Sequence, residues 1–336
     1  MEYLYRAYGL TCLSDVPIGG FFRESTISQV VDVTIHLNRR PAWVDAAQTL
    51  ATRKFYSKPT ASDLGDSAYD VNVLGANQFF QLMYSDGTEF MIDALGRRVW
   101  GHSGGGFPQD YLETYLRGPI MGFVLRLRNV TALHASAVSV HGQAIVLCGE
   151  SGSGKSTTAA GFALAGASVL CDDIVPVVTH RDEFFVCPGY PQIGLWPDAV
   201  QGLLGAADAL PRWTANWEKC FLALDGKNGR FEAHNLPLGA IYLLAPRTTS
   251  STAPRIEELR NHEALIELVQ NTYMNWLLDT RQRAIEFDFL VGVLAHVPVK
   301  RVVAHSDPAR MCALRDLVAE DVRLSPRSAT IAATPS

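Results

Sequence analysis

The segment from Gly149 to Thr157 constrains the fold of this chain more than any other. Its sequence, Gly-Glu-Ser-Gly-Ser-Gly-Lys-Ser-Thr, fits the phosphate-binding P-loop pattern G-x-x-x-x-G-K-[ST] without a mismatch. An apolar run at 143–148 precedes it and predicts a buried strand. An alanine-rich run at 157–164 follows it and predicts a helix that ends at Gly166. The segment therefore predicts an α/β nucleotide-binding domain.

The chemistry of this segment indicates a bound nucleoside triphosphate. Its glycines let backbone N–H groups point at phosphate oxygens, and the start of the following helix adds its positive dipole end. Lys155 can reach the β- and γ-phosphates, and the hydroxyl of Ser156 can bind Mg²⁺. We expect ATP and Mg²⁺, although the motif also suits GTP. The residues expected to bind the nucleotide are Gly149, Ser151, Gly152, Ser153, Gly154, Lys155, Ser156 and Thr157.

Composition predicts a folded cytoplasmic protein large enough for two domains. The chain has 336 residues, 48% hydrophobic and 19% charged, with a net charge of −5. This charge, without a basic stripe, argues against nucleic acid or an anionic membrane as partner. No apolar run approaches the ~20 residues of a membrane span, and the first residues lack the apolar core of a signal peptide. The six scattered cysteines are expected to be buried thiols.

Three regions are expected along the chain. Residues 1–125 predict a mixed, mainly β N-terminal domain, which we interpret as a recognition or regulatory domain because it carries no catalytic cluster. Residues 126–324 predict the nucleotide-binding catalytic domain. Residues 325–336 are small and polar, which predicts a disordered tail.

Local patterns predict particular elements in both domains. Phe79–Tyr84 and Glu89–Ile92 flank an Asp-Gly turn, which is typical of a hairpin. Apolar residues at helical spacing predict a helix over 110–127 that Pro119 interrupts or kinks. A similar pattern predicts a helix within 254–273.

Asp172 and Asp173 are the best candidates for the acidic groups that a P-loop kinase needs. They follow an apolar run at 168–171, and the end of that strand would face the phosphate site in an open α/β sheet. One carboxylate could serve the metal and the other the acceptor hydroxyl. Adjacent residues of an extended strand point to opposite faces, so the chain must turn here if both are to face the nucleotide. A solvated turn that begins a hairpin is the alternative interpretation.

The stretch from His134 to Pro176 resembles the catalytic core of HPr serine kinase/phosphorylases, which share a nucleotide fold with phosphoenolpyruvate carboxykinases. It contains a histidine, the P-loop lysine and an Asp-Asp pair in that family's order and spacing. The resemblance implies that Asp172 takes the proton from an acceptor hydroxyl and that Asp173 and Ser156 bind Mg²⁺. It also implies that Lys155 binds the phosphates and that His134 lies near the transferring phosphoryl group. By itself, His134 in its apolar run would be interpreted as a core residue.

A wider likeness covers nearly the whole chain. Residues 5–18, 188–198 and 237–242 resemble HPr-kinase-like proteins encoded with bacterial peptide-modification machinery. Some of those relatives phosphorylate the C-terminal serine of lasso-peptide precursors, which implies a peptide or small-protein acceptor here. The second signature loop of HPr kinases, which is tied to phosphorolysis, has no counterpart that we can locate in this sequence.

Three functions compete on these observations. The first is an ATP- and Mg²⁺-dependent serine kinase that acts on a peptide or small protein. The second is a small-molecule kinase resembling phosphoenolpyruvate carboxykinase, which would need arginines near the P-loop, whereas the nearest arginine downstream is Arg181. The third is a non-catalytic, nucleotide-gated binding protein. The oligomeric state stays open, since related folds commonly form homo-oligomers.

Three further side chains allow two interpretations each. Lys219 could stabilise phosphoryl charge or be a solvated surface lysine. Tyr190 and Trp196 could contact the base or a peptide, or could be core aromatics.

Overall fold

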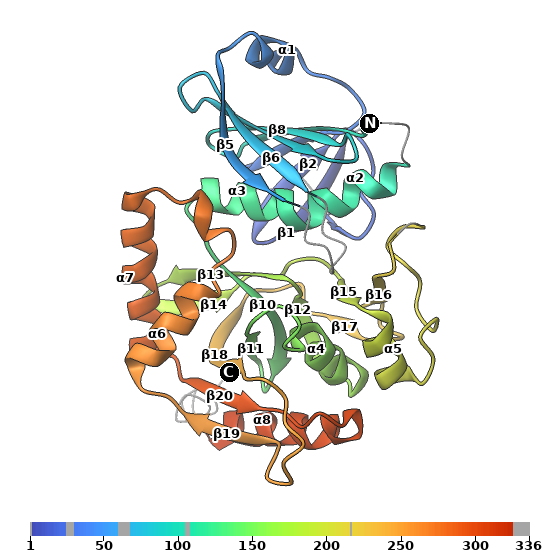
Figure 1. Ribbon diagram of the computed structural model, residues 1–336, viewed down its shortest axis with the longest axis vertical. Helices are drawn as coiled ribbons and strands as arrows, with labels where there is room; N and C mark the ends of the chain where they lie inside the picture. Colours follow the sequence, from blue (N-terminus) through green and yellow to red (C-terminus); the bar gives the residue numbers. More distant parts are fainter. Residues whose placement is uncertain (1, 25–29, 60–67, 105–107, 216, 325–336) are drawn as a thin grey trace. The chain divides into compact units, whose positions relative to one another are not determined.

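The computed structural model divides the chain into two compact units. It describes residues 2–24, 30–59, 68–104, 108–215 and 217–324, so the expected tail at 325–336 lies outside the described residues. The N-terminal unit comprises Met1–Asn129 with Trp213–Trp217, and the C-terminal unit comprises Val130–Arg212 with Glu218–Ser336. Both units combine strands with fewer helices, so the protein is mixed α/β and mostly sheet (Figure 1).

The described part of the N-terminal unit is built on one nine-stranded sheet. Its strands are ordered β3-β1-β2-β4-β9-β8-β7-β6-β5. They are β1 (Tyr3–Ala7), β2 (Leu10–Ser14), β3 (Phe22–Arg23), β4 (Val33–His36), β5 (Thr52–Lys58), β6 (Tyr69–Leu74), β7 (Phe79–Tyr84), β8 (Glu89–Asp93) and β9 (Arg98–His102). The predicted hairpin is confirmed, because β7 and β8 pair antiparallel across a turn in which Gly87 has φ 85°.

Helices cover both faces of this sheet. Helix α1 (Ala42–Gln48) contributes Trp43, which stacks on Phe79 at 5.8 Å, and α3 (Met121–Leu127) contributes Phe123, which contacts Phe80 at 5.3 Å. Neighbouring residues of a strand point to opposite faces, so the two helices lie on opposite sides. The helix predicted over 110–127 is confirmed as α2 (Gln109–Tyr115), the π-helical turn η2 (Leu116–Ile120) and α3, with Pro119 inside the π-helical turn.

The sheet of the C-terminal unit places the strand before the P-loop segment between two long strands. β11 (Gln143–Cys148) pairs antiparallel with β10 (Thr131–Val140) and parallel with β18 (Leu236–Leu244). The other strands of this sheet are β12 (Ser168–Cys171), β13 (Ile174–His180), β14 (Glu183–Val186), β17 (Arg230–Phe231), β19 (Arg255–Glu258) and β20 (Val299–Val303). A separate two-stranded ribbon consists of β15 (Gln192–Leu195) and β16 (Cys220–Ala223).

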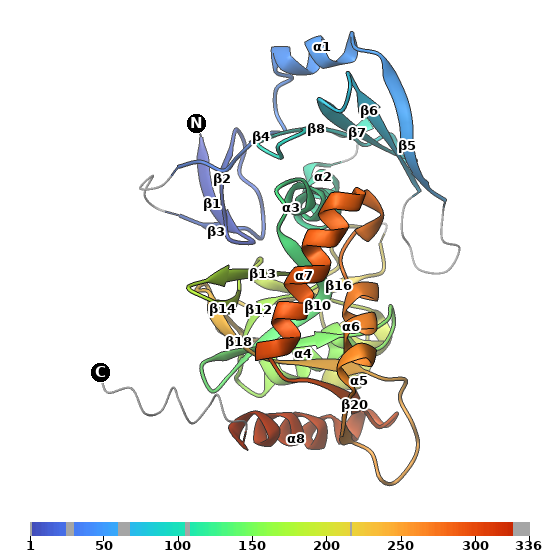
Figure 2. The same cartoon turned by 90° about the vertical axis from the view of Figure 1, so that its left-hand side faces the viewer.

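Two layers of helices cover this sheet, and β11 shows why. Ile145 and Leu147 face a core with α4 (Lys155–Leu164), α5 (Pro197–Leu204) and α8 (Met311–Leu324). Val146 and Cys148 face the other core, with α6 (Asn261–Gln270) and α7 (Thr280–His296), which lie side by side in Figure 2. A strand buried on both faces has no polar side to expose, which accounts for its continuous apolar run.

Two expectations need correction. The helix predicted within 254–273 begins only at Asn261, because residues 255–258 form β19, where Ile256 pairs with Val302 of β20. Pairing with a strand distant in sequence overrides the helical spacing of these apolar residues. Five cysteines are buried free thiols as expected, but Cys312 on α8 is exposed.

Candidate functional site

Three strands bring the predicted site residues to one edge of the sheet. β11 and β12 both run antiparallel to β10, so they end at the same edge. Cys148, the last residue of β11, pairs with Ala135, and Cys171, the last residue of β12, pairs with Ala137. The loop after β11 and the turn after β12 therefore both adjoin residues 134–136 of β10.

The backbone of the P-loop segment requires its glycines. Gly149, Gly152 and Gly154 have φ of 148°, 81° and 95°, which side chains disfavour. A Cβ on Gly149 would also lie 2.9 Å from the carbonyl oxygen of Leu244 in β18. The loop thus packs against the end of the neighbouring parallel strand and turns directly into α4.

Lys155 is buried at the start of α4 and folds back over the loop. Its Nζ donates to the carbonyl oxygens of Gly149 at 2.8 Å and Glu150 at 3.0 Å. Burial lowers the pKa of Lys155, and the nearby Asp173 carboxylate opposes that shift. The ammonium has three donors, so one remains for a ligand.

The other loop residues present accessible polar groups. Ser151 and Gly152 are exposed, and Ser156 and Thr157 are half-buried in the first turn of α4. Ser153 Oγ is buried without a hydrogen-bond partner among the described residues. An unpaired hydroxyl in a loop of this shape suits a phosphate oxygen.

The chain turns sharply at Asp172 and Asp173, as the argument from strand geometry required. Asp173 has φ 71°, and the N–H of Ile174 donates to the carbonyl oxygen of Asp172 at 2.9 Å, which closes a γ-turn. Strand alternation therefore ends at Cys171. The alternative interpretation, a solvated turn, does not hold for Asp172, because only 5% of that residue is exposed.

The carboxylate of Asp172 is held by two fixed donors. Ser136 Oγ donates to its Oδ1 at 2.7 Å, and the N–H of Gly194 donates to its Oδ2 at 2.9 Å. Burial raises the pKa of Asp172, while the Lys219 ammonium and the Ser136 hydrogen bond oppose the shift. A carboxylate made more basic by burial, yet fixed in position, suits proton transfer.

His134 connects β10 to Asp173. Its Nδ1 lies 3.3 Å from Asp173 Oδ1, and its ring stacks on Tyr273 with centroids 6.1 Å apart. Burial lowers the pKa of His134, against the opposing effect of Asp173. The structure therefore brings His134, Lys155, Asp172 and Asp173 into one cluster.

Sequence reasoning missed three residues of this cluster. Ser136 carried a signal, because it lies two positions from His134 and so shares its face of the strand. Arg247 follows β18, the parallel neighbour of β11, and its Cζ lies 3.1 Å from the position of a Cβ on Gly154. No sequence pattern indicated Gly194, because its hydrogen bond to Asp172 depends only on where the ribbon of β15 and β16 lies in the fold.

The three residues left with two interpretations are now placed. Tyr190 is buried, with 9% exposed, as a core aromatic would be. Trp196 is 37% exposed, and Lys219 Nζ lies 5.9 Å from the centre of its ring.

The donor set fits Mg²⁺. The half-buried Ser156 hydroxyl and the partly exposed Asp173 carboxylate are hard oxygen donors. Mg²⁺ in nucleotide sites is bound through one or two protein oxygens together with phosphate oxygens and water. Among the described residues no group of three or more His, Cys, Asp and Glu side chains could hold a metal ion by itself.

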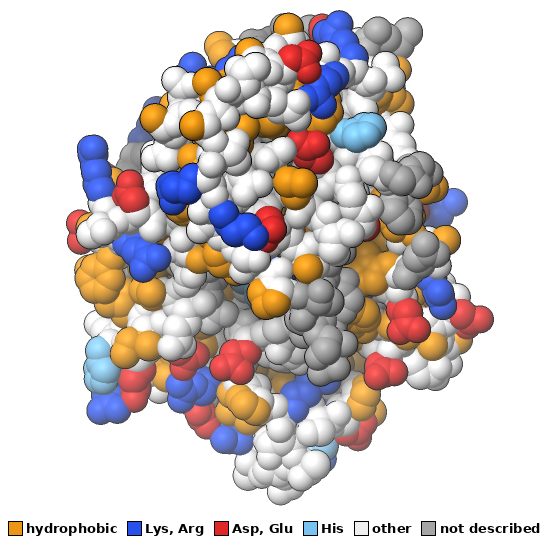
Figure 3. Space-filling view, turned by 45° about the horizontal axis from the view of Figure 1, so that its top comes forward, with side chains coloured by type: hydrophobic (Ala, Val, Ile, Leu, Met, Phe, Trp, Pro, Cys, Tyr) orange, Lys and Arg blue, Asp and Glu red, His pale blue; other side chains and the backbone are white. Residues whose placement is uncertain are grey.

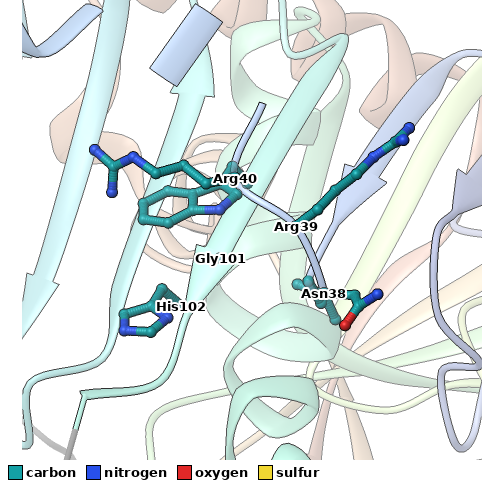
Figure 4. A pocket seen from close by; sticks show the side chains of 7 residues that line it. Asn38, Arg39, Arg40, Gly101 and His102 are labelled. Atoms are coloured by element: carbon teal, nitrogen blue, oxygen red, sulfur yellow. The ribbon is translucent and has the colours of Figure 1, made fainter. Parts of the chain in front are cut away.

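A hollow lies in the N-terminal unit. It has a volume of about 240 Å³ and is lined by Leu37, Asn38, Arg39, Arg40, Trp100, Gly101 and His102. Arg40 lies along the Trp100 indole and pairs with Asp45, whereas Arg39 points away from them (Figure 4). Because Arg39 and Arg40 diverge, the described residues around this hollow form no cluster of cations, and we place the candidate site in the C-terminal unit.

On the face shown in Figure 3, basic and acidic side chains are interspersed. No helix in the part of the chain that the structure describes is both long and apolar enough to cross a membrane.

Comparisons with known proteins leave the family open. No protein-family model matches this chain, and no curated protein matches it. Among solved structures, the HPr(Ser) kinase/phosphatase from Coxiella burnetii is similar at 12% sequence identity with a TM-score of 0.30. The match covers 56% of this chain and 95% of that one. A likeness at this TM-score does not establish fold or function, which therefore have to be argued from the site.

Proposed function

We propose that the C-terminal unit is an ATP- and Mg²⁺-dependent kinase that transfers the γ-phosphoryl group to a serine hydroxyl of a peptide or small protein. The observation that carries this proposal is the position of Lys155 and Asp172 in the segments that follow β11 and β12, the two strands that flank β10. A phosphate loop alone would suit any nucleotide-binding protein. A buried, oriented carboxylate beside it adds the group that receives a proton from an acceptor.

Each residue of the site has its own role in the proposed reaction. The acceptor oxygen forms a bond to the γ-phosphorus, its proton passes to Asp172, and the bond to the β–γ bridging oxygen breaks to release ADP. Lys155 and the loop N–H groups hold the phosphates, while Ser136 and Gly194 keep Asp172 in position. Ser156 and Asp173 would hold Mg²⁺, which when bound neutralises charge on the phosphate oxygens.

The acceptor is proposed from the sequence resemblance, which suggests the C-terminal serine of a lasso-peptide precursor. One observation favours the second candidate, a small-molecule kinase. Arg247 lies against Gly154 although it is far from the loop in sequence, and an arginine there could bind an anionic acceptor. The complete set of Lys155, Ser156, Asp172 and Asp173 argues against a non-catalytic binding protein.

The test is phosphoryl transfer to defined acceptors. The purified chain is incubated with Mg²⁺ and labelled ATP in the presence of peptides ending in serine, the same peptides ending in alanine, and small hydroxy acids. We expect mass spectrometry to find a phosphate adduct on the serine peptides only. An adduct on the hydroxy acids alone would favour the small-molecule kinase. Nucleotide binding without any transfer would favour the non-catalytic protein.

A further inference from the structure

The ribbon of β15 and β16 joins the candidate site at one end. Gly194 of β15 donates its N–H to Asp172 Oδ2, and the next pair of the ribbon is Leu195 with Cys220. Trp196 follows Leu195, and Lys219 precedes Cys220. These two residues therefore extend the ribbon at the end that adjoins Asp172.

The ammonium of Lys219 has a defined place at this end. It lies 5.9 Å from the centre of the Trp196 ring, and the lysine is half-buried. Lys219 directly precedes Cys220, whose partner Leu195 follows the Gly194 that binds Asp172. The ammonium therefore lies at the end of the ribbon that adjoins Asp172, beside the space in which the proposed reaction takes place.

The proposed reaction would be assisted by a further cationic side chain in that space, in addition to Lys155 and the Mg²⁺ ion. Phosphoryl transfer passes through a loose transition state with negative charge on three equatorial oxygens. Lys155 has committed two of its three donors to Gly149 and Glu150, so it offers one to the phosphates. The lysine side chain is flexible, so its ammonium can stay in contact with the phosphoryl group while negative charge develops on the phosphoryl oxygens.

We propose that Lys219 is a catalytic residue that contacts the transferring phosphoryl group from the ribbon, as Lys155 does from the loop. This inference rests on the proposed kinase function. The interpretation of Lys219 as a solvated surface lysine is set aside because the lysine is half-buried beside Trp196, at the end of the ribbon that adjoins Asp172.

The test compares a ground-state ligand with a mimic of the transferring group. Dissociation constants are measured for Mg·ADP and for Mg·ADP with aluminium fluoride. We expect Lys219→Met to weaken the aluminium fluoride complex by about 10²- to 10³-fold and Mg·ADP by less than about threefold. Lys219→Arg should recover part of the loss. Lys227→Met, at an exposed position in the turn after β16, is the matched control and should change neither constant.

The outcomes separate this inference from the proposed function. Equal weakening of both complexes, or of neither, would overturn the role of Lys219. If the wild-type chain binds Mg·ADP and aluminium fluoride does not increase its affinity, the role of Lys219 is also overturned, while nucleotide binding is retained. A wild-type chain that binds neither would overturn both proposals. If Lys219→Met does not fold, Lys219→Gln gives the same comparison.

Discussion

Ser136 and Asp172 are joined by a 2.7 Å hydrogen bond in which both side chains are buried. Ser136 lies on β10, between the strands that carry the loop and the acidic turn, so its hydroxyl is fixed by the sheet. Removing a partner from a buried charged group costs about 1–3 kcal/mol. Ser136 is therefore a positioning residue for the proposed base.

Ser136→Ala should slow phosphoryl transfer by about 10- to 100-fold, because the carboxylate loses one of its two fixed donors. Nucleotide affinity should stay within about threefold, since Ser136 does not belong to the loop. Steady-state kinetics and calorimetry measure the two effects. Ser139→Ala, at a half-buried position on the same strand, is the control. A full rate in Ser136→Ala would show that Gly194 alone orients Asp172.

Asp172→Asn should reduce transfer by about 10²- to 10⁴-fold, the usual contribution of a general base. The amide keeps an oxygen for one of the two donors, so folding and nucleotide binding should persist. Binding of a fluorescent ATP analogue and the rate of peptide phosphorylation check this. Strong residual transfer would remove Asp172 from the base role.

Asp173→Asn should instead raise the Mg²⁺ concentration needed for half-maximal rate.

Lys155→Ala should weaken nucleotide binding and transfer together. The ammonium is expected to hold phosphate, and it also holds the loop through Gly149 and Glu150. Removing it exposes two carbonyls that lose a charged donor, at about 1–3 kcal/mol. Titration calorimetry with Mg·ATP gives the affinity, and thermal unfolding gives the stability. An unchanged affinity would contradict the assignment of the loop.

How much of this site the sequence could predict depends on how local each contact is. The loop, its lysine and the flanking strand and helix are contiguous, so residues 143–164 specify them without reference to the rest of the fold. The turn at Asp173 was required by strand geometry together with the assumption that both carboxylates face one ligand. These elements are local, and the structure contains each of them.

The remainder depends on pairings between distant strands. Arg247 reaches the loop because β18 lies parallel to β11, and Lys219 reaches Asp172 because β16 pairs with β15. Neither pairing can be recognised from the sequence of the strands that form it. For the same reason Ile256 fits a helical spacing and yet lies in a strand.

Gly154→Ala should reduce stability and nucleotide affinity more than the backbone conformation alone explains. Gly154 and Gly205 both have positive φ, 95° and 83°, and an alanine at either position costs about 1 kcal/mol. Only at Gly154 would the new Cβ also meet Arg247, since nothing lies within 4 Å at Gly205. Thermal unfolding of both variants separates the two effects. Equal losses would show that the Arg247 side chain moves aside freely.

The titration of Glu113 is expected to make the stability of the N-terminal unit depend on pH. Glu113 in α2 is 8% exposed and accepts hydrogen bonds from the N–H of Gly19 at 2.9 Å and from Gln109 Nε2 at 2.8 Å. Burial is the largest influence on its pKa, which is raised. Its contribution to stability is therefore complete below the unfolded pKa of about 4.3 and is lost as pH rises through the higher folded pKa.

Glu113→Gln should remove this dependence, because glutamine does not titrate. The free energy of unfolding of the variant, relative to that of the wild type, should therefore rise between pH 4 and pH 7. Urea unfolding at both pH values measures the difference, and the subtraction cancels the other acidic groups that the two proteins share. A difference that stays constant with pH would show that the folded and unfolded states bind the Glu113 proton equally well.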